Sequence, residues 1–412
     1  MDIYDKLETL ENELNAEFKE HMIPFWKGMI DRNYGGYYGR MSFDLSLDNK
    51  ADKGCILNSR ILWFFSTLAD YYDDEELLRY AAHAYRFMKE RFFDKQSGGV
   101  YWSVAYDGNV DDDSKHTYNQ AFAIYGLAAF YRASGDENAL RDAYDLFDTI
   151  EARCRDSEGY LEAFSREFLP VSNEKLSENG VMADRTMNTI LHVMEAYTEL
   201  FDVDDNDVYG RRHSVKKRLI EILNIFKEKI YNPDLERLEV FFDKDYNSLI
   251  DLHSFGHDIE AAWLLDRTVQ VLENNGTVVD EEISYIIETL TEKIYEDAFD
   301  GKSVPAESED GKVLETRIWW VQSEAMNGFL NGYMYHGKNE KYAEAVINIW
   351  DYIKHTIVDK RCGSEWFSEV GADGTPDSSM DIVNEWKCPY HNGRMFVEMV
   401  SRIENILAEE EE

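Results

Sequence analysis

Positive charge and proline are both scarce in this chain. Lys and Arg number 43 against 82 Asp and Glu, which gives a formal net charge of −39. Nucleic-acid-binding surfaces need basic side chains to neutralise phosphates, and anionic membranes also attract basic segments. The charge therefore excludes nucleic acids and anionic membranes as expected partners. Proline contributes 6 of 412 residues, well below the usual share of about 5%, so we expect a mainly helical chain.

Cysteine and long apolar runs are scarce as well. The four cysteines are isolated, and none forms the C-x-x-C pair of zinc ribbons and thioredoxin-like sites. No stretch approaches the 18 apolar residues of a membrane-spanning helix. The acidic N-terminus has no apolar segment of the kind found in secretory signals. We therefore expect a cytoplasmic protein with reduced thiols.

Apolar residues make up 44% of the chain and recur at helical spacing. In the first segment they follow each other at steps of three or four from Ile3 to Met22, after which Pro24 is expected to end the helix. Similar spacing predicts further helices at about residues 55–70, 76–92, 118–133, 137–153, 184–201, 213–230, 257–273, 281–295, 319–336, 340–356 and 389–407.

Short segments that begin with Asp, usually rich in Gly and aromatic residues, separate alternate helices. They begin at Asp31, Asp94, Asp156, Asp234, Asp300 and Asp359. Gly36 and Gly99, at matching positions, are 63 residues apart, and only the step to the fourth segment is clearly longer because of an insertion near 202–212. Such a repeat of two helices and one loop predicts a closed ring.

The predicted fold is therefore all-α: an (α/α)6 barrel of six helical hairpins, formed by residues 1–412 as a single domain, with short extended loops over one end. An open solenoid such as a tetratricopeptide array is the alternative, but its period of about 34 residues fits less well.

Two histidines are predicted at the starts of helices. Gly256 is expected to break the chain, so that His257 begins a helix, with Glu260 one turn further on to orient it. Pro389 suits the first turn of the last helix and places His391 in a matching position. The helix dipole disfavours a cation there, and a neutral imidazole is what a general base requires. Helix-capping histidines with a structural role are the alternative.

Two further pairs are spaced i,i+4 on helices. Trp320 and Glu324 have the composition of a sugar site, in which a ring stacks on C–H groups and a carboxylate takes hydroxyls. Asn188 and His192 share a face of an otherwise apolar helix. Plain core packing explains either pair as an alternative.

Arg60 lies within an apolar run, where a buried Arg is either paired or functional. It would suit a developing oxyanion, and a structural ion pair is the alternative. Tyr118 and Gln120 offer weaker hydroxyl contacts. His253 and His257 are also i,i+4, but the glycine between them and the lack of a third ligand argue against a metal.

Together these residues favour proton transfer on a carbohydrate without metal or cofactor. In the open form of a reducing sugar the C2 proton lies next to a carbonyl, and its removal leaves a cis-enediolate. A second acid on the opposite face would invert C2, whereas return of the proton to C1 would give a ketose. The sequence does not show which faces the histidines occupy.

Three segments, 254–260, 319–322 and above all 386–394, resemble the cellobiose 2-epimerase family of the N-acylglucosamine 2-epimerase superfamily. The resemblance runs from the Gly-Gly-Tyr-Tyr loop at 35–38 to the final helix. It implies an (α/α)6 barrel that epimerises C2 of the reducing-end sugar in β-1,4-linked disaccharides. The reactions would convert cellobiose to glucosyl-mannose, lactose to epilactose and mannobiose to mannosyl-glucose, with no metal or nucleotide.

The resemblance also implies roles for individual residues. His257 and His391 would be the acid/base pair, His192 would assist ring opening, and Arg60 would hold the enediolate oxygens. The residues that would bind or border the sugars are Asn188, Tyr118, Glu260, Trp320, Glu324 and Trp386. Phe255 stands where some relatives have Tyr.

Other functions stay open at this stage. A mannose-type aldose–ketose isomerase shares the expected barrel, and an (α/α)6 glycoside hydrolase would use paired carboxylates such as Glu260 and Glu324. A sugar-binding scaffold without activity is a further alternative. We expect a monomer whose partner is a small disaccharide.

Overall fold

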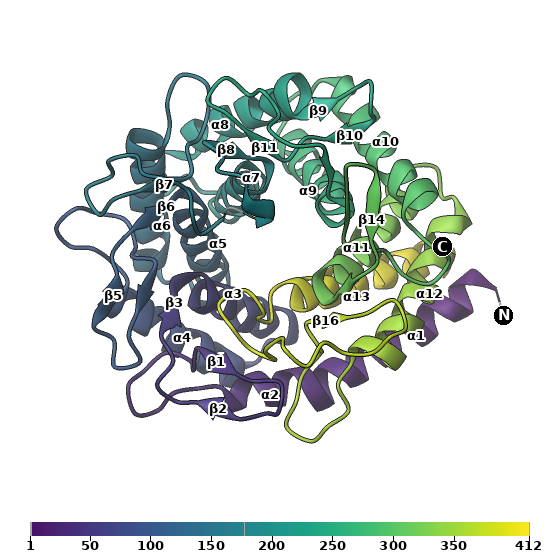
Figure 1. Ribbon diagram of the computed structural model, residues 1–412, viewed down its shortest axis with the longest axis horizontal. Coiled ribbons are helices and arrows are strands. Elements are labelled where there is room, and N and C mark those ends of the chain that lie inside the picture. Colours follow the sequence, from purple (N-terminus) through teal and green to yellow (C-terminus); the bar gives the residue numbers. More distant parts are fainter. Residues whose placement is uncertain (1, 177, 412) are drawn as a thin grey trace.

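The computed structural model describes residues 2–176 and 178–411, and within them helices alternate between an outer and an inner ring (Figure 1). The outer helices are α1 (Ile3–Glu17) with its continuation α2 (Ile23–Gly28), α4 (Glu75–Arg91), α6 (Glu137–Thr149), α8 (Arg212–Ile225), α10 (Glu281–Asp297) and α12 (Glu340–Tyr352). The inner helices are α3 (Cys55–Tyr72), α5 (Thr117–Ser134), α7 (Met187–Val203), α9 (Phe255–Asn274), α11 (Trp319–Tyr335) and α13 (His391–Glu411).

The ring is closed. Each inner helix packs against the next one in the chain, and α13 returns to pack against α3 (Figure 1). The first outer helix, α1, lies against both α12 and α13. Closure confirms the predicted (α/α)6 barrel and excludes an open solenoid. Among the helices of the described residues, none combines the length and the hydrophobicity of a membrane-spanning segment.

Burial explains which helices form the inner ring. Helices α3 and α5 are buried over nearly all of their turns, because they pack on both neighbours and on an outer helix. The outer helices α6 and α12 instead have one apolar face and one acidic or polar face. The hydrophobic core therefore lies between the two rings.

Antiparallel strands lie in the segments that lead from each outer helix to the next inner helix. Their bounds are β1 (Arg40–Met41), β2 (Leu47–Asp48), β3 (Lys53–Gly54), β4 (Ser103–Val104), β5 (Val110–Asp112), β6 (Lys115–His116), β7 (Ala163–Phe164), β8 (Arg185–Thr186), β9 (Tyr231–Asn232), β10 (Arg237–Leu238), β11 (Phe241–Phe242), β12 (Leu252–His253), β13 (Glu307–Glu309), β14 (Lys312–Leu314), β15 (Arg317–Ile318) and β16 (Glu369–Val370). Pairs such as β6–β7 and β15–β16 join neighbouring segments at one end of the barrel.

Each loop segment is anchored at its first residue. The Oδ1 atom of Asp31 accepts hydrogen bonds from the backbone N–H groups two and three residues ahead. The same pair of bonds is made by Asp94, Asp156, Asn232 and Asp300. The fourth segment therefore begins at Asn232, and the predicted start at Asp234 is wrong by two residues.

Ion pairs tie these anchors to the inner helices, and the basic side chain of each pair is buried. Lys53 Nζ lies 2.7 Å from Asp31 Oδ2, and a basic side chain two residues before an inner helix makes the same contact at Lys115–Asp94, Arg185–Asp156 and Arg317–Asp300. In the fourth segment the anchor is neutral. There His253 takes the place of the cation and contacts Asp258 at 3.0 Å.

The structure differs from the predicted helix limits at three places. Pro24 does not end the first helix, because a π-helical turn at Phe18–Met22 accommodates its missing N–H and the chain continues as α2. Gly256 does not precede the helix as a breaker but lies within the first turn of α9. Pro389 precedes α13, which begins at His391. π-helical turns also prolong three other outer helices, at Ile150–Cys154, Phe226–Ile230 and Ile353–Ile357, and a 3₁₀ turn spans Glu178–Gly180.

Candidate active site

A cavity of about 600 Å³ lies where the N-terminal turns of the inner helices meet the loop segments. Each inner helix contributes to its wall, from Arg60 on α3 round the ring to His391 on α13. Nine of the ten predicted site residues line this cavity: Arg60, Tyr118, Asn188, His192, His257, Glu260, Trp320, Trp386 and His391. Only Glu324 does not.

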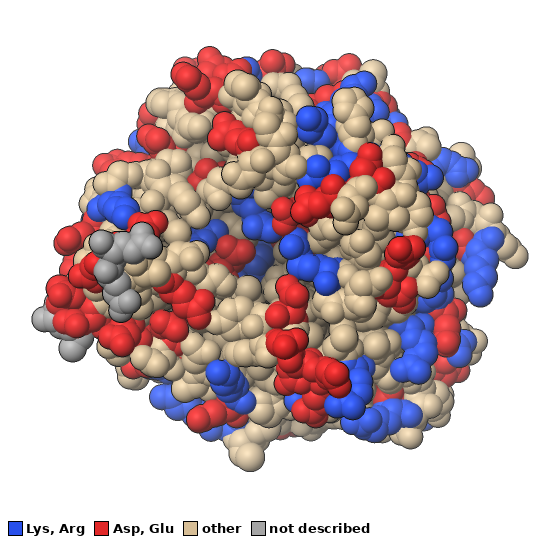
Figure 2. Space-filling model, turned by 180° about the vertical axis from the view of Figure 1, so that it is seen from behind, with Lys and Arg blue, Asp and Glu red and all other residues tan. Residues whose placement is uncertain are grey.

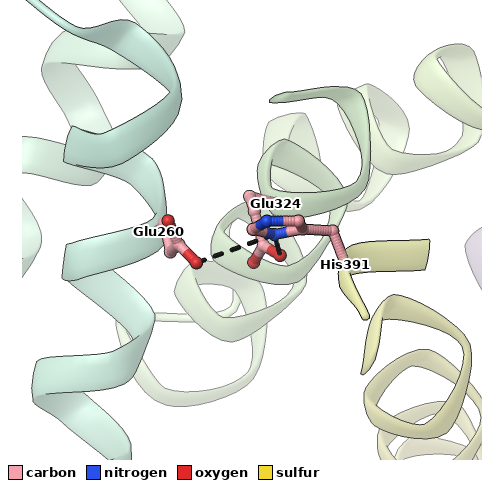
Figure 3. A group of neighbouring side chains, drawn as sticks. All are labelled: Glu260, Glu324 and His391. Atoms are coloured by element: carbon pink, nitrogen blue, oxygen red, sulfur yellow. Dashed lines mark hydrogen bonds and ion pairs between the residues drawn. The ribbon is translucent and has the colours of Figure 1, made fainter. Parts of the chain in front are cut away.

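His391 is the first residue of α13 and is 7% exposed. Its Nδ1 atom lies 2.8 Å from Glu324 Oε1 and 3.8 Å from Glu260 Oε1 (Figure 3). A carboxylate accepts, so Nδ1 carries the hydrogen and Nε2 keeps its lone pair. Burial and the nearby guanidinium groups of Arg60 and Arg394 lower the pKa of His391 well below its usual value.

His257 lies in the first turn of α9, and its Nδ1 atom is 2.7 Å from Ser254 Oγ. Burial, together with the neighbouring His192, lowers the pKa of His257 to about 3. The imidazole is therefore neutral near pH 7, as predicted for a general base. The expectation that Glu260 orients it is wrong, because the hydroxyl of Ser254 takes that place and Glu260 lies beside His391.

Trp320 connects the two histidines. Its ring centroid is 4.8 Å from that of His257 and 5.3 Å from that of His391. Because Trp320 also lines the cavity, it fixes the separation of the two imidazoles and offers an apolar surface to a sugar. The close approach of Trp320 to α9 depends on Gly256, where a Cβ atom would lie 2.5 Å from the indole ring.

Substitution of Gly256 by Ala is expected to displace Trp320 and to destabilise the protein by about 1–3 kcal/mol, the usual cost of overpacking. Epimerase activity should fall with it, because Trp320 contacts both histidines. Denaturant unfolding measures the stability change. Gly28→Ala is the matched control, since no atom lies within 4 Å of the added Cβ. Equal stability of the two variants would contradict this account of Gly256.

His192 lies on α7 with its Nδ1 atom 2.8 Å from Glu195 Oε2. Burial lowers its pKa, while the charge of Glu195 opposes that shift. One turn before it, Asn188 lines the same cavity, and among the described residues its Oδ1 atom has no hydrogen-bond partner although it is buried. The predicted Asn188–His192 pair is therefore brought together at the cavity wall, with an amide oxygen available for a sugar hydroxyl.

Arg60 is buried without a carboxylate partner in the described part of the chain. Its Nη2 atom donates to Tyr118 Oη at 2.9 Å, and Nη1 donates to the Trp386 carbonyl oxygen at 3.3 Å. Its guanidinium also lies over the Phe122 ring, with the carbon 4.2 Å from the centroid. The structural ion pair considered from the sequence is absent from these contacts. A buried cation without a counter-ion suits an anionic ligand or intermediate.

Glu324 does not reach the cavity, although it was predicted to bind sugar hydroxyls beside Trp320. It is fully buried behind His391 and outside the cavity wall, with Oε1 bonded to His391 and Arg394 and Oε2 bonded to Trp263 Nε1. This geometry favours an orienting role over sugar contact. Glu260 does reach the cavity, and burial next to Glu324 raises its pKa to about 8.

Three side chains that support the histidines are not among the predicted site residues: Ser254, Glu195 and Arg394. Arg394 is fully buried and bonds to Glu195, Glu260 and Glu324. The i,i+3 spacing of His192 and Glu195 was a signal for one of them. No spacing pattern in the sequence indicated the contacts of Arg394, because they join helices that are far apart in the chain.

Comparisons with known proteins agree with this site. The N-acylglucosamine 2-epimerase (GlcNAc 2-epimerase) family model matches residues 36–392. A cellobiose 2-epimerase of Eubacterium cellulosolvens is 50% identical over 394 residues, covering 93% of this chain and 96% of the relative. One of Ruminococcus albus is 46% identical and covers 95% and 98%.

A solved structure agrees as well. The crystal structure of a sugar epimerase from a ruminal bacterium matches with a TM-score of 0.91 at 45% identity, over 95% of this chain and 99% of that one. The family model includes the turns of α9 and α13 that carry His257 and His391, and these relatives cover more than nine tenths of the chain. This chain is therefore a carbohydrate epimerase that belongs to the N-acylglucosamine 2-epimerase family.

Proposed function

We propose that the protein epimerises C2 of the reducing-end glucose or mannose in β-1,4-linked disaccharides such as cellobiose, lactose and mannobiose. One observation carries the proposal. Two neutral imidazoles, from α9 and α13, line one cavity beside a buried guanidinium that has no carboxylate partner among the described residues. The relatives named cellobiose 2-epimerase support the disaccharide as substrate.

The proposed reaction begins with ring opening, assisted by His192, to the free aldehyde. The Nε2 atom of one neutral histidine removes the C2 proton, and the electron pair moves to O1 to give a cis-enediolate. Arg60 stabilises the developing negative charge. The second histidine, protonated at Nε2, gives its proton to the opposite face of C2, the C1 carbonyl forms again and the ring closes. Each turnover therefore needs one neutral and one protonated imidazole.

The cavity volume and lining suit a disaccharide. About 600 Å³ falls within the roughly 300–1,000 Å³ of small-molecule sites. Trp320 and Trp386 offer ring faces or edges to C–H groups, while Asn188 and Glu260 offer oxygens. The reducing-end sugar would lie at the histidines, with the second sugar toward the loops.

Hydrolysis by Glu260 and Glu324 is disfavoured by their environment. Glu324 has both oxygens bonded to protein groups and does not line the cavity. Arg394 binds both carboxylates from one side. A glycosidase needs two carboxyl groups that flank the scissile bond.

Chelation of metal ions is expected to leave activity unchanged. In the described residues the group with suitable spacing for a metal is Glu260, Glu324 and His391, whose ligand atoms lie within 4.8 Å of one another. Arg394 donates to both carboxylates, so a cation already fills this position. Assays before and after treatment with EDTA test the expectation. A clear loss of activity that a divalent metal restores would contradict it.

The expected compartment and oligomeric state belong to the same proposal. The four cysteines are unpaired, and only Cys362 is exposed, which agrees with a reducing compartment such as the cytoplasm. A closed ring with its own core suits a monomer.

Product analysis tests the proposed reaction. Incubation with cellobiose should yield glucosyl-mannose as the main product, which chromatography against standards identifies. Glucosyl-fructose as the main product would mean an aldose–ketose isomerase, and free glucose would mean a hydrolase. Either result would overturn the proposal.

A further inference from the structure

Two of the three cavity histidines, His192 and His391, are not held independently. His192 bonds to Glu195 on its own helix, and His391 bonds to Glu324 on α11. One guanidinium connects the two carboxylates: Arg394 donates through Nη1 to Glu195 Oε1 and through Nη2 to Glu324 Oε1, the latter at 2.7 Å. Tyr390 closes the network, because its hydroxyl donates to Glu195 Oε2 and accepts from Arg394.

We propose that Arg394 and Glu195 are positioning residues that join His192 and His391 into one hydrogen-bonded unit. A change of charge near one of these histidines then alters the electrostatic environment of the other. The inference rests on the proposed function for its kinetic consequences only. Neither residue lies at the reacting carbon: Arg394 and Glu195 are absent from the cavity wall that the three histidines line.

Charge counting within the network supports this role. Glu195, Glu260 and Glu324 surround one Arg394, and all four side chains are buried. Burial and the neighbouring Glu324 raise the pKa of Glu260 to about 8, so Glu260 takes up a proton at a higher pH than an ordinary glutamate does. When Glu260 is protonated, Glu195 and Glu324 against Arg394 leave one negative charge in this group, which favours an imidazolium, whereas Arg60 opposes it. The proposed reaction requires one protonated histidine.

Glu195 and Arg394 approach solvent from the far end of the barrel, on the side away from the cavity that the histidines line. A second cavity of about 330 Å³ lies there, and Glu195 and Arg394 form part of its wall. Figure 2 shows a hollow near the centre of that face, with basic and acidic side chains in it. Three further arginines of this wall, Arg132, Arg267 and Arg402, pair with Glu199, Asp202 and Glu398. These pairs are separate from the histidines.

Glu199 therefore offers a matched control for Glu195. Both glutamates lie on α7, one turn apart, and both are nearly buried. Glu199 pairs with Arg132 and Arg267 and contacts no imidazole in the described residues. Glu195→Gln removes the negative charge but keeps the side-chain volume. The NH₂ group of the new amide replaces one carboxylate oxygen and faces a donor. The hydrogen bond to Arg394, or the bonds to His192 and Tyr390, are therefore lost.

Loss of the Glu195 charge is expected to lower kcat about 10- to 100-fold, the range for a hydrogen bond to a charged group, with KM little changed. Several groups face these histidines: Arg60 from α3, Tyr118 from α5, Glu195 from α7, His257 and Glu260 from α9, Glu324 from α11, Tyr390 just before α13 and Arg394 from α13. Removing one anion from this set disfavours imidazolium. The pKa of both His192 and His391 should therefore fall.

The test combines ¹⁵N NMR of the histidine rings with steady-state kinetics over pH. In Glu195→Gln, the His192 and His391 signals should both change, whereas Glu199→Gln should leave both signals and kcat unchanged. Tyr390→Phe, a milder change, should move the same signals less and covers the case that Glu195→Gln fails to fold. Unchanged His391 signals in folded Glu195→Gln and in Tyr390→Phe would overturn the inference, even if the wild-type protein had no epimerase activity. Absence of wild-type epimerisation would instead refute the proposed function.

Discussion

Replacement of His391 by Asn is expected to abolish epimerisation while proton exchange with solvent continues at C2 of one epimer. Loss of a general acid or base costs about 10²–10⁴-fold. His391 lines the cavity together with a separate neutral histidine, His257, which remains able to take a C2 proton. The proton that His257 removes exchanges with solvent and returns to the same face. The variant should therefore label one disaccharide without converting it.

Deuterium uptake from heavy water measures this outcome by NMR, with each epimer supplied separately. His253→Asn is the matched control, because His253 pairs with Asp258 and does not line the cavity. It should epimerise at close to the wild-type rate. Epimerisation by His391→Asn within tenfold of wild type would show that His391 is not half of the acid/base pair.

Replacement of Arg60 by Met is expected to lower kcat about 10²–10³-fold without loss of stability. The guanidinium contributes charge at the enediolate, and removal of one such donor has that cost. In the free protein, however, Arg60 is a buried cation without a carboxylate partner in the described residues. Its removal leaves no unpaired anion, and Met fills a similar volume.

Arg185→Met gives the contrasting result. Arg185 is also buried, but it lies 2.6 Å from Asp156 Oδ2, so its removal leaves an anion without its partner and should lower stability. Kinetics and denaturant unfolding of the two variants separate the cases. If Arg60→Met unfolded as readily as Arg185→Met, with activity lost in proportion, a structural role would replace the catalytic one.

The fold could be predicted from the sequence because the repeat is both long and regular. A period of about 63 residues with two helices and one loop fits a closed ring better than an open array, and the closure of α13 on α3 confirms it. The local errors have local causes. Pro24 is accommodated by a π-helical turn. Gly256 was expected to interrupt the helix, but it instead allows Trp320 to pack closely against α9.

The residues of the site could be predicted from the sequence, but how deeply each side chain lies in the barrel could not. Helical spacing correctly indicates that Trp320 and Glu324 share a side of α11, yet it does not say that Glu324 lies one turn deeper, behind His391. The partners of the histidines depend on contacts between helices. Glu195 and Arg394 are 199 positions apart and meet only because the ring closes. No spacing rule within one helix predicts such a pair.

One measurement tests the account most directly: NMR of the wild-type protein with cellobiose in deuterated water, without added metal. The account predicts glucosyl-mannose that carries deuterium at C2, because the proton removed by one histidine and the proton delivered by the other both exchange with solvent. Epimer that retains the original hydrogen at C2, or deuterium at C1 of a ketose as the main product, would contradict a two-histidine epimerisation at this site.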